Sequence, residues 1–116
     1  MQQSYRLRKN KQYQYVYHRG RSCACREIVL LYARSSKLQV GFSVSRKVGN
    51  SVVRNRVKRR MREQFRALIP QLKRGFYVVV ARESAAKADS RALGAALLSA
   101  ARRQKLLLGE NAGQQP

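Results

Sequence analysis

The sequence predicts one domain of mixed α and β class, and three observations lead to this prediction. The chain has 116 residues, of which 44% are hydrophobic, so it can bury one modest core. Residues 51–69 carry apolar side chains at the helical period, whereas residues 76–81 form an almost continuous apolar run of strand length. Residues 38–45 alternate as a strand does. A strand, a helix and a strand at this spacing predict two parallel strands joined by the helix.

A short helix is expected first, over residues 11–19, with Asn10 as its cap and Gly20 as its end. The basic segment before it, residues 4–9, is expected to be extended. One face of the helix combines apolar and aromatic side chains: Tyr13, Val16 and Tyr17. A fully buried tyrosine needs a hydrogen-bond partner for its hydroxyl, so this face is unlike an ordinary buried stripe. Two interpretations stay open. The helix is either half-buried against a sheet, or it presents rings on which bases can stack at the edge of a cleft.

Two strands should follow this helix. The first runs from Ala24 or Cys25 to Ala33, and residues 34–37 make a connection of hairpin length. The second, residues 38–45, has one apolar side and one side of small residues. The apolar side consists of Val40, Phe42 and Val44, and the small side of Gly41, Ser43 and Ser45. The small side is either a solvent-facing polar surface or a shallow floor that a nucleic-acid strand could approach closely.

The long helix is expected after a turn at Gly49 and Asn50, with Ser51 as its cap. It should end near Ile69, because Pro70 disfavours helical backbone in the residue before it. Its apolar stripe is Val53, Val57, Met61, Phe65 and Leu68. A row of basic side chains one step round the helix suits a polyanion with repeating phosphates: Arg54, Lys58, Arg62 and Arg66, with Arg59 close by.

The rest of the chain is expected to complete the domain. Residues 73–75 form a turn, residues 76–81 a buried strand and residues 82–88 a loop. A last helix, capped by Asp89 or Ser90, should run to about Lys105. Residues 109–116 are expected to be a disordered tail. The sequence contains no internal repeat and no domain linker.

The charge points to a polyanionic partner. The formal net charge is +21, from 26 Lys and Arg residues against five acids. Such self-repulsion is tolerable when a counter-charged partner is normally bound, and nucleic acid is the first candidate. An anionic membrane surface is the alternative, although no apolar run is long enough to span a membrane. The N-terminus lacks the apolar core of a secretory signal, so the cytoplasm is the expected location.

Residues for protein-based catalysis are scarce. Cys23 and Cys25 lie two apart at the expected start of a strand, where both would point to one face, and they are expected to be free thiols. His18 is the only histidine, and the five acids are spread along the sequence. This inventory argues against a zinc site and against a self-sufficient hydrolase. No catalytic residue is therefore expected in the chain.

Residues 40–59, VGFSVSRKVGNSVVRNRVKR, closely resemble the signature of the bacterial ribonuclease P protein subunit, with Arg54-Asn55-Arg56 at its core. Residues 6–20 and 77–82 also resemble that family, and the likeness covers about residues 6–105. The resemblance implies an α+β fold: a two-layer sandwich of helices on a mixed sheet of about four strands, in the order αβββαβα. It further implies a left-handed crossover through the basic helix and a short strand beyond the three identified above. The whole chain, 1–116, is then expected to be one domain, ordered over about 6–105.

The resemblance also implies a mechanism. In this family the RNA subunit is the catalyst, and it uses Mg²⁺ to remove the 5′ leader from precursor tRNA. The protein is expected to bind that RNA, in a 1:1 complex, together with the leader, and to hold no cofactor tightly itself. The expected partners are therefore the RNA subunit and precursor tRNA, with no membrane involved.

Site residues follow from the family motifs. The RNA subunit is expected to contact the helix and the loop before it: Arg46, Lys47, Asn50, Arg54, Asn55, Arg56, Lys58, Arg59 and Arg62. Asn55 is a candidate to orient its charged neighbours or a metal-bound water. The leader is expected in a cleft between the first helix and the sheet, on Tyr13, Tyr17 and Ser43. At the family's aromatic position on the first strand this chain has Leu31, with Tyr32 beside it. Tyr32 is a leader candidate only if the register shifts by one residue.

Two other function classes fit parts of the sequence. A structural RNA-binding protein of ribosomal type would show the same size and charge, and only the long signature and the aromatic helix argue against it. A self-contained nuclease would need a carboxylate or histidine cluster, which the sequence lacks.

Overall fold

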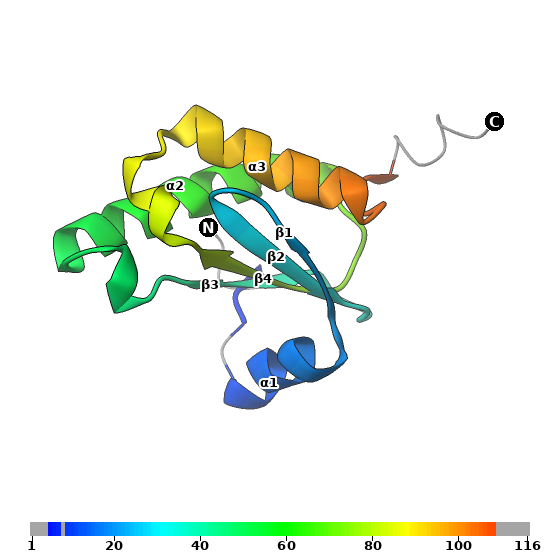
Figure 1. The fold of residues 1–116 in the computed structure, drawn as a ribbon. Helices are drawn as coiled ribbons and strands as arrows, with labels where there is room; N and C mark the ends of the chain where they lie inside the picture. Colours follow the sequence, from blue (N-terminus) through cyan, green and yellow to red (C-terminus); the bar gives the residue numbers. More distant parts are fainter. Residues whose placement is uncertain (1–4, 8, 109–116) are drawn as a thin grey trace.

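The computed structural model describes residues 5–7 and 9–108. The tail expected at 109–116 lies outside the described residues. Figure 1 shows two helices side by side on one face of a twisted sheet, α2 (Ser51–Leu68) and α3 (Ser90–Arg103), and a single helix on the other face, α1 (Asn10–Arg19). The order of the main elements is αβββαβα, and the expected α+β sandwich is confirmed.

The sheet has four strands in the order β1-β2-β4-β3. The strands are β1 (Arg21–Ala24), β2 (Ile28–Ala33), β3 (Gln39–Ser43) and β4 (Phe76–Ala81). The β1–β2 and β2–β4 pairs are antiparallel, whereas β3 and β4 are parallel and joined through α2. The parallel pair with the basic helix as its connection, expected from the sequence, is therefore present.

The strand expected from Ala24 or Cys25 to Ala33 begins later, at Ile28, and a strand that was not expected from the pattern, β1, precedes it. Residues 25–27 turn the chain, the amide of Cys25 donates to the carbonyl of Ile28 (2.7 Å), and β1 pairs back on β2. This hairpin supplies the additional strand that the family resemblance implied. The turn contains neither Gly nor Pro, so local sequence gives no signal for it.

The helix boundaries correct two expected caps. Asn50, and not Ser51, caps α2, because its side-chain oxygen accepts from the amide of Val53 (3.0 Å). In α1, Asn10 is the first helical residue, and the Gln12 side chain accepts from the amide of Lys9 at the start of the helix. Gly20 ends α1 as expected. Asp89 caps α3 by accepting from the amide of Ala92 (2.8 Å), as one of the two expected alternatives.

Short 3₁₀ helices lie in the connections between these elements. Arg46–Val48 (η2) follows β3, Ile69–Gln71 (η3) ends the long helix at Pro70, and Glu83–Lys87 (η4) lies in the loop expected after β4. Of the lead-in expected at residues 4–9, positions 4 and 8 lie outside the described residues. Arg6 and Leu7 join the free edge of β3, where the amide of Leu7 donates to the carbonyl of Val40 (3.0 Å).

The sheet separates two apolar clusters. The larger lies under α2 and α3 and includes Val57, Met61 and Phe65 from the predicted stripe of the long helix. The smaller lies under α1, where Val16 is fully buried against Val78 and Leu7. Within residues 5–7 and 9–108, no helix is long and apolar enough to cross a membrane.

Candidate nucleic-acid interface

The basic side chains of α2 lie outside the apolar stripe that holds the helix on the sheet. Val57, Met61 and Phe65 are buried at intervals of four residues, which leaves the side of the helix opposite this stripe open to a partner. The sequence-predicted residues for the RNA subunit all reach solvent. Five are exposed and four partly exposed: Arg46, Lys47, Asn50, Asn55 and Arg59, then Arg54, Arg56, Lys58 and Arg62. The set lies along η2 and α2, but not on one face of the helix, because Arg56 is one turn before Arg60 and shares its side.

The guanidinium groups on this surface have few internal acceptors. Arg54 donates from Nε to the carbonyl of Gly49 (3.2 Å), which holds it against the start of the helix. The Nε of Arg56 is buried without an acceptor among the described residues. Glu63 is the only acid of α2, and its carboxylate lies 3.9 Å from Arg59 Nε in a solvent-exposed pair. Such a pair contributes little to stability, so α2 keeps most of its charge for a partner.

Arg60 differs from its neighbours. Its Nη1 donates to the carbonyl of Ala88 (2.9 Å), so this arginine links α2 to the segment before α3. The side chain of Gln64, one turn further, lies against Gly94 of α3. This flank of α2, which also carries Arg56, therefore faces the rest of the protein. The opposite flank, with Asn55, Arg59 and Arg62, remains for RNA.

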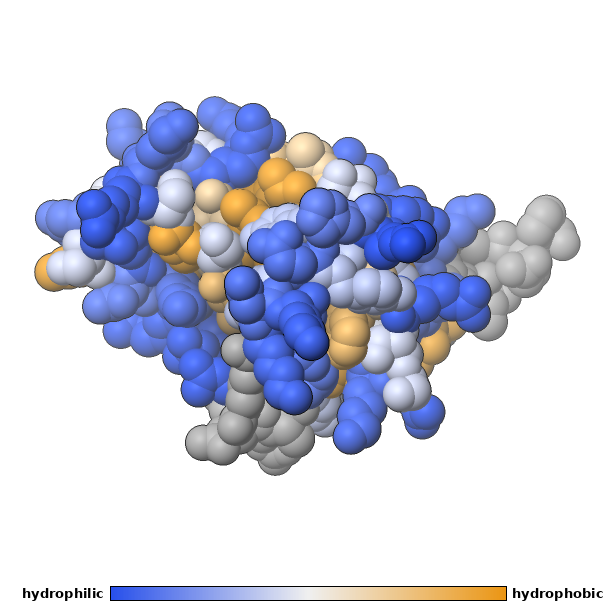
Figure 2. All heavy atoms as spheres, turned by 90° about the horizontal axis from the view of Figure 1, so that it is seen from below, coloured by the Kyte–Doolittle hydropathy of each residue, from blue (hydrophilic) through white to orange (hydrophobic). Residues whose placement is uncertain are grey.

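A second surface lies on the other face of the sheet, beside α1. The strand register places the side chains of Val29, Val80 and Ser43 in one row across β2, β4 and β3. All three are partly exposed, whereas the neighbouring row is covered, with Val78 fully buried under α1. Figure 2, which views this side of the molecule, shows apolar atoms exposed among hydrophilic side chains. The row Val29–Val80–Ser43 is therefore a partly exposed strip of the sheet beside α1, where the family resemblance predicts the leader cleft. We call this strip, with α1 beside it, the cleft.

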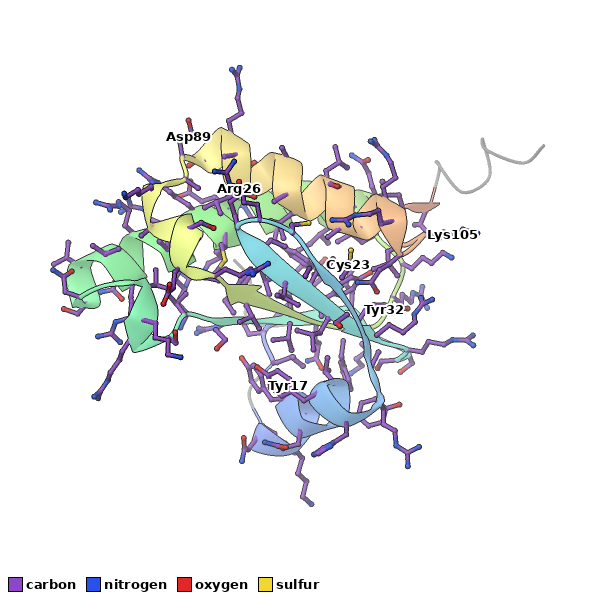
Figure 3. The ribbon with its side chains drawn as sticks, viewed as in Figure 1. Tyr17, Cys23, Arg26, Tyr32, Asp89 and Lys105 are labelled. Atoms are coloured by element: carbon purple, nitrogen blue, oxygen red, sulfur yellow. The ribbon has the colours of Figure 1, made fainter. Side chains whose placement is uncertain are left out.

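The wall of this cleft is aromatic. Tyr13 lies directly over Gly41, where an added Cβ would overlap the tyrosine ring, so the ring reaches the sheet only because residue 41 is glycine. Burial raises the pKa of Tyr13, the neighbouring Tyr17 raises it further, and Arg6 opposes this shift. Tyr13, Tyr17 and Arg6 therefore lie close enough to interact. Tyr17 is 44% exposed, and Figure 3 shows it on α1, below the sheet.

Tyr32 does not belong to this cleft. Adjacent residues of a strand point to opposite faces, and Leu31 takes the cleft side. Tyr32 is only 6% exposed in the core under α2 and α3, with its hydroxyl donating to the carbonyl of Arg74 (2.6 Å). Its assignment to the leader site is wrong, because the register that puts Tyr32 opposite Tyr77 leaves it no access to the α1 face.

The structure also adds residues that the sequence did not single out. Val29 and Val80 form the cleft floor with Ser43, and Arg6 stands beside Tyr13. The valines could not be identified from their own strands, since only the strand order brings them beside Ser43. The sequence showed Arg6 as a basic residue of the lead-in, but it did not predict that Arg6 lies at the edge of β3.

The described residues hold no group of three or more His, Cys, Asp or Glu side chains that could bind a metal ion. Cys23 and Cys25 are free thiols, as expected. Cys25 lies beside Arg103, whose Nη2 approaches its sulfur (2.9 Å). Neither cysteine reaches the cleft or the outer face of α2.

Comparison with known proteins agrees with this geometry. The family model described as Ribonuclease P matches residues 1–105. The ribonuclease P protein component of Exiguobacterium sp. is 47% identical over 87 residues, which cover 73% of this chain and 76% of that protein. The corresponding protein of Symbiobacterium thermophilum is 44% identical over 89 residues, covering 74% of this chain and 77% of its own.

Solved structures give the same result. The RNase P protein of Staphylococcus aureus has a TM-score of 0.83 and 30% identity, covering 90% of this chain and 99% of that one. The RNase P protein of Thermotoga maritima has a TM-score of 0.73 and 27% identity, covering 81% and 92%. By sequence match over most of its length and by fold, the chain belongs to the bacterial ribonuclease P protein family.

Proposed function

We propose that this chain is the protein subunit of ribonuclease P and that it binds two RNAs on two separate surfaces. The observation that supports this most directly is the position of the aromatic cleft. It lies under α1, on the opposite face of the sheet from the body of α2. A protein that only coated a structural RNA would need the basic surface and not a second, aromatic one.

The surface along η2 and α2 is proposed to bind the RNA subunit. Its arginines and lysines suit phosphate contacts, which position an RNA without reading its sequence. The buried stripe of Val57, Met61 and Phe65 keeps α2 rigid on the sheet, so the charges are pre-arranged for a folded RNA. Binding through this surface releases counterions and should weaken steeply with salt.

The cleft is proposed to bind the 5′ leader of precursor tRNA. A single-stranded leader has unpaired bases that can stack on Tyr13 and Tyr17, while Arg6 can approach its backbone. The floor of Val29, Val80 and Ser43 lets a strand approach closely, because none of these side chains is large. Such contacts would favour precursor over mature tRNA.

Catalysis is proposed to belong to the RNA subunit, which would supply the Mg²⁺ that activates water for phosphodiester cleavage. Mg²⁺ prefers oxygen ligands such as carboxylates, and Asn55 lies between two arginines, Arg54 and Arg56, in the sequence of α2. Those charges oppose direct binding of a cation, so only a contact through water suits Asn55. The protein is proposed to act in the cytoplasm, one copy per RNA subunit.

Reconstitution with a candidate RNA subunit tests the proposal. At low magnesium concentration, addition of the protein should raise the cleavage rate of precursor tRNA, because the protein offsets phosphate repulsion between the two RNAs. The protein without the RNA should not cleave. Activity of the protein alone that survives treatment with a ribonuclease would overturn the proposal. Binding to the RNA without any effect on precursor cleavage would indicate a structural RNA-binding protein instead.

A further inference from the structure

A second basic site lies at the far end of the sheet from η2. It is a pocket of about 400 Å³. Four cationic side chains line it together with a tyrosine and a serine: Arg21, Arg34, Lys73, Arg74, Tyr32 and Ser35. These residues come from the start of β1, the end of β2 and the loop before β4, so the pocket exists only in the folded chain.

Hydrogen bonds fix the backbone of two of the cationic residues, Lys73 and Arg74. The hydroxyl of Tyr32 donates to the carbonyl of Arg74 (2.6 Å), and that of Tyr77 donates to the carbonyl of Lys73 (2.6 Å). The amide of Lys73 donates to Leu106 (2.9 Å). Gly75 has a φ of 155°, and a Cβ there would overlap the Tyr32 ring, so this loop closes tightly over the tyrosine. The loop is therefore a fixed support for its side chains.

The other two cations flank the same tyrosine. Arg21 lies opposite Tyr32 in the β1–β2 register, and its Nη2 reaches the carbonyl of Gln104 (3.5 Å). Arg34 follows β2 directly. Both guanidinium groups act to lower the pKa of Tyr32, against the larger effect of burial. Both also line the pocket with that tyrosine.

The lining contains no acid to balance these charges. Four cations around one small pocket repel each other, and a bound anion would relieve that repulsion. Arginine binds phosphate through paired N–H groups, and the hydroxyl of Ser35 can donate a further hydrogen bond. The chemistry that fits the pocket is a phosphate group.

The position of the pocket selects between the two RNAs. Tyr32 belongs to the face of the sheet opposite the cleft, so a leader lying on Val29, Val80 and Ser43 is separated from the pocket by the sheet. The long helix, in contrast, leads toward it, because only η3 and Leu72 stand between α2 and Lys73. At 1.5 Å per residue, the 18 residues of α2 span about 27 Å from its first turn to this end.

We propose that the pocket formed by Arg21, Arg34, Lys73 and Arg74 binds a backbone phosphate of the RNA subunit, as a contact separate from those of η2 and the first turns of α2. This rests on the proposed function, which supplies the RNA. The protein would then hold the RNA subunit at both ends of the long helix, which constrains its orientation more than one contact could.

The test compares two double variants in binding to the RNA subunit over a range of salt concentrations. Arg34→Ala with Arg74→Ala removes two charges from the pocket, while the Arg74 carbonyl that accepts from Tyr32 remains. Lys37→Ala with Lys87→Ala removes the same charge from exposed positions outside the pocket lining. In the pocket variant, the slope of log K for RNA binding against log salt concentration should decrease in magnitude by about one to two units, as expected for the loss of phosphate contacts. The control variant should change this slope clearly less.

Equal slopes for the two double variants would overturn the proposal. Arg59→Ala is measured in the same assay to separate this failure from a failure of the proposed function. If Arg59→Ala changes the salt slope and the pocket variant does not, only the assignment of the pocket is overturned. Unaltered slopes in both would remove the RNA-binding assignment as a whole. A loss confined to precursor tRNA carrying a leader would assign the pocket to the substrate and overturn its assignment to the RNA subunit. Thermal unfolding of each variant checks that the fold is intact.

Discussion

The ring of Tyr13 lies directly over Gly41, in the space that a side chain at residue 41 would occupy. This contact joins α1 to β3 and sets the wall of the cleft against its floor. Glycine at this position is therefore a requirement of the site and not only of the strand.

Gly41→Ala should move the Tyr13 ring off the sheet, since the added methyl group overlaps it. We expect weaker binding of precursor tRNA by the holoenzyme, with mature tRNA nearly unaffected. We also expect a stability loss within the range of about 1–3 kcal/mol typical of overpacking. Gly94→Ala is the matched control, because its methyl group would meet the flexible end of Gln64. Binding assays and thermal unfolding distinguish the two; equal effects on precursor binding would contradict the role of Gly41.

Tyr13→Ala tests the stacking role itself. Removal of the ring should cost about 1–3 kcal/mol in the binding of precursor tRNA, the range measured for stacking of one base on an aromatic side chain, and little for mature tRNA. Tyr15→Ala is the control from the same helix, since that ring packs edge-on against Phe76 (6.1 Å between centroids) instead of lying over Gly41. Losses of the same size for precursor and mature tRNA would exclude a leader contact at Tyr13.

Local pattern predicted the elements of this fold better than their arrangement. The span of α2 followed from its stripe and from Pro70, and β4 from its continuous apolar run. The β1–β2 turn was missed because residues 25–27 contain no turn-forming residue. The cap of α2 was misplaced by one position, because Asn50 and Ser51 are equally good caps by residue type. Only the backbone geometry decides between them.

The sequence predicted the basic surface of α2 but only Ser43 from the floor of the cleft. Residues next to each other in sequence, such as those of α2, lie together once the helix is placed. The floor of the cleft depends on strand order, which puts β4 between β2 and β3 and so brings Val29 and Val80 beside Ser43. Whether Leu31 or Tyr32 faced the cleft depended on register, which no residue type near them determines.

Arg59 and Glu63 provide a test of the RNA surface in both directions. Arg59→Ala should weaken assembly with the RNA subunit and lower the salt slope by about one unit, as for loss of one phosphate contact. Glu63→Gln should strengthen assembly, because it removes the only acid of α2 and frees the Arg59 guanidinium from its 3.9 Å ion pair. Arg60→Ala is the contrast: its hydrogen bond to Ala88 predicts loss of stability with a smaller change in slope. An unchanged slope for Arg59→Ala would remove it from the interface.

The cap of α2 gives a stability prediction that separates two adjacent residues. Asn50→Ala removes the oxygen that accepts from the Val53 amide and should cost about 1 kcal/mol in the free energy of unfolding. Ser51→Ala leaves that hydrogen bond intact and should be close to neutral. Denaturant unfolding of both variants provides the measurement. A larger loss for Ser51→Ala than for Asn50→Ala would show that the helix begins one residue later.

The two buried tyrosines predict how stability changes at alkaline pH. Burial raises the pKa of Tyr32 and of Tyr77 above the ordinary value near 10, so the folded chain keeps both protons where the unfolded chain loses them. The unfolded state then binds fewer protons than the folded state, and the free energy of unfolding must fall as pH rises above about 10.

Tyr77→Phe should make this fall shallower, although it loses the hydrogen bond to Lys73 and starts from a lower stability, by about 0.5–1.5 kcal/mol. Denaturant unfolding from pH 8 to 11 would show the difference as a change in slope between Tyr77→Phe and the parent chain, with Tyr15→Phe as the control at an exposed ring. Parallel curves for Tyr77→Phe and the parent would contradict the assignment of the fall to Tyr77.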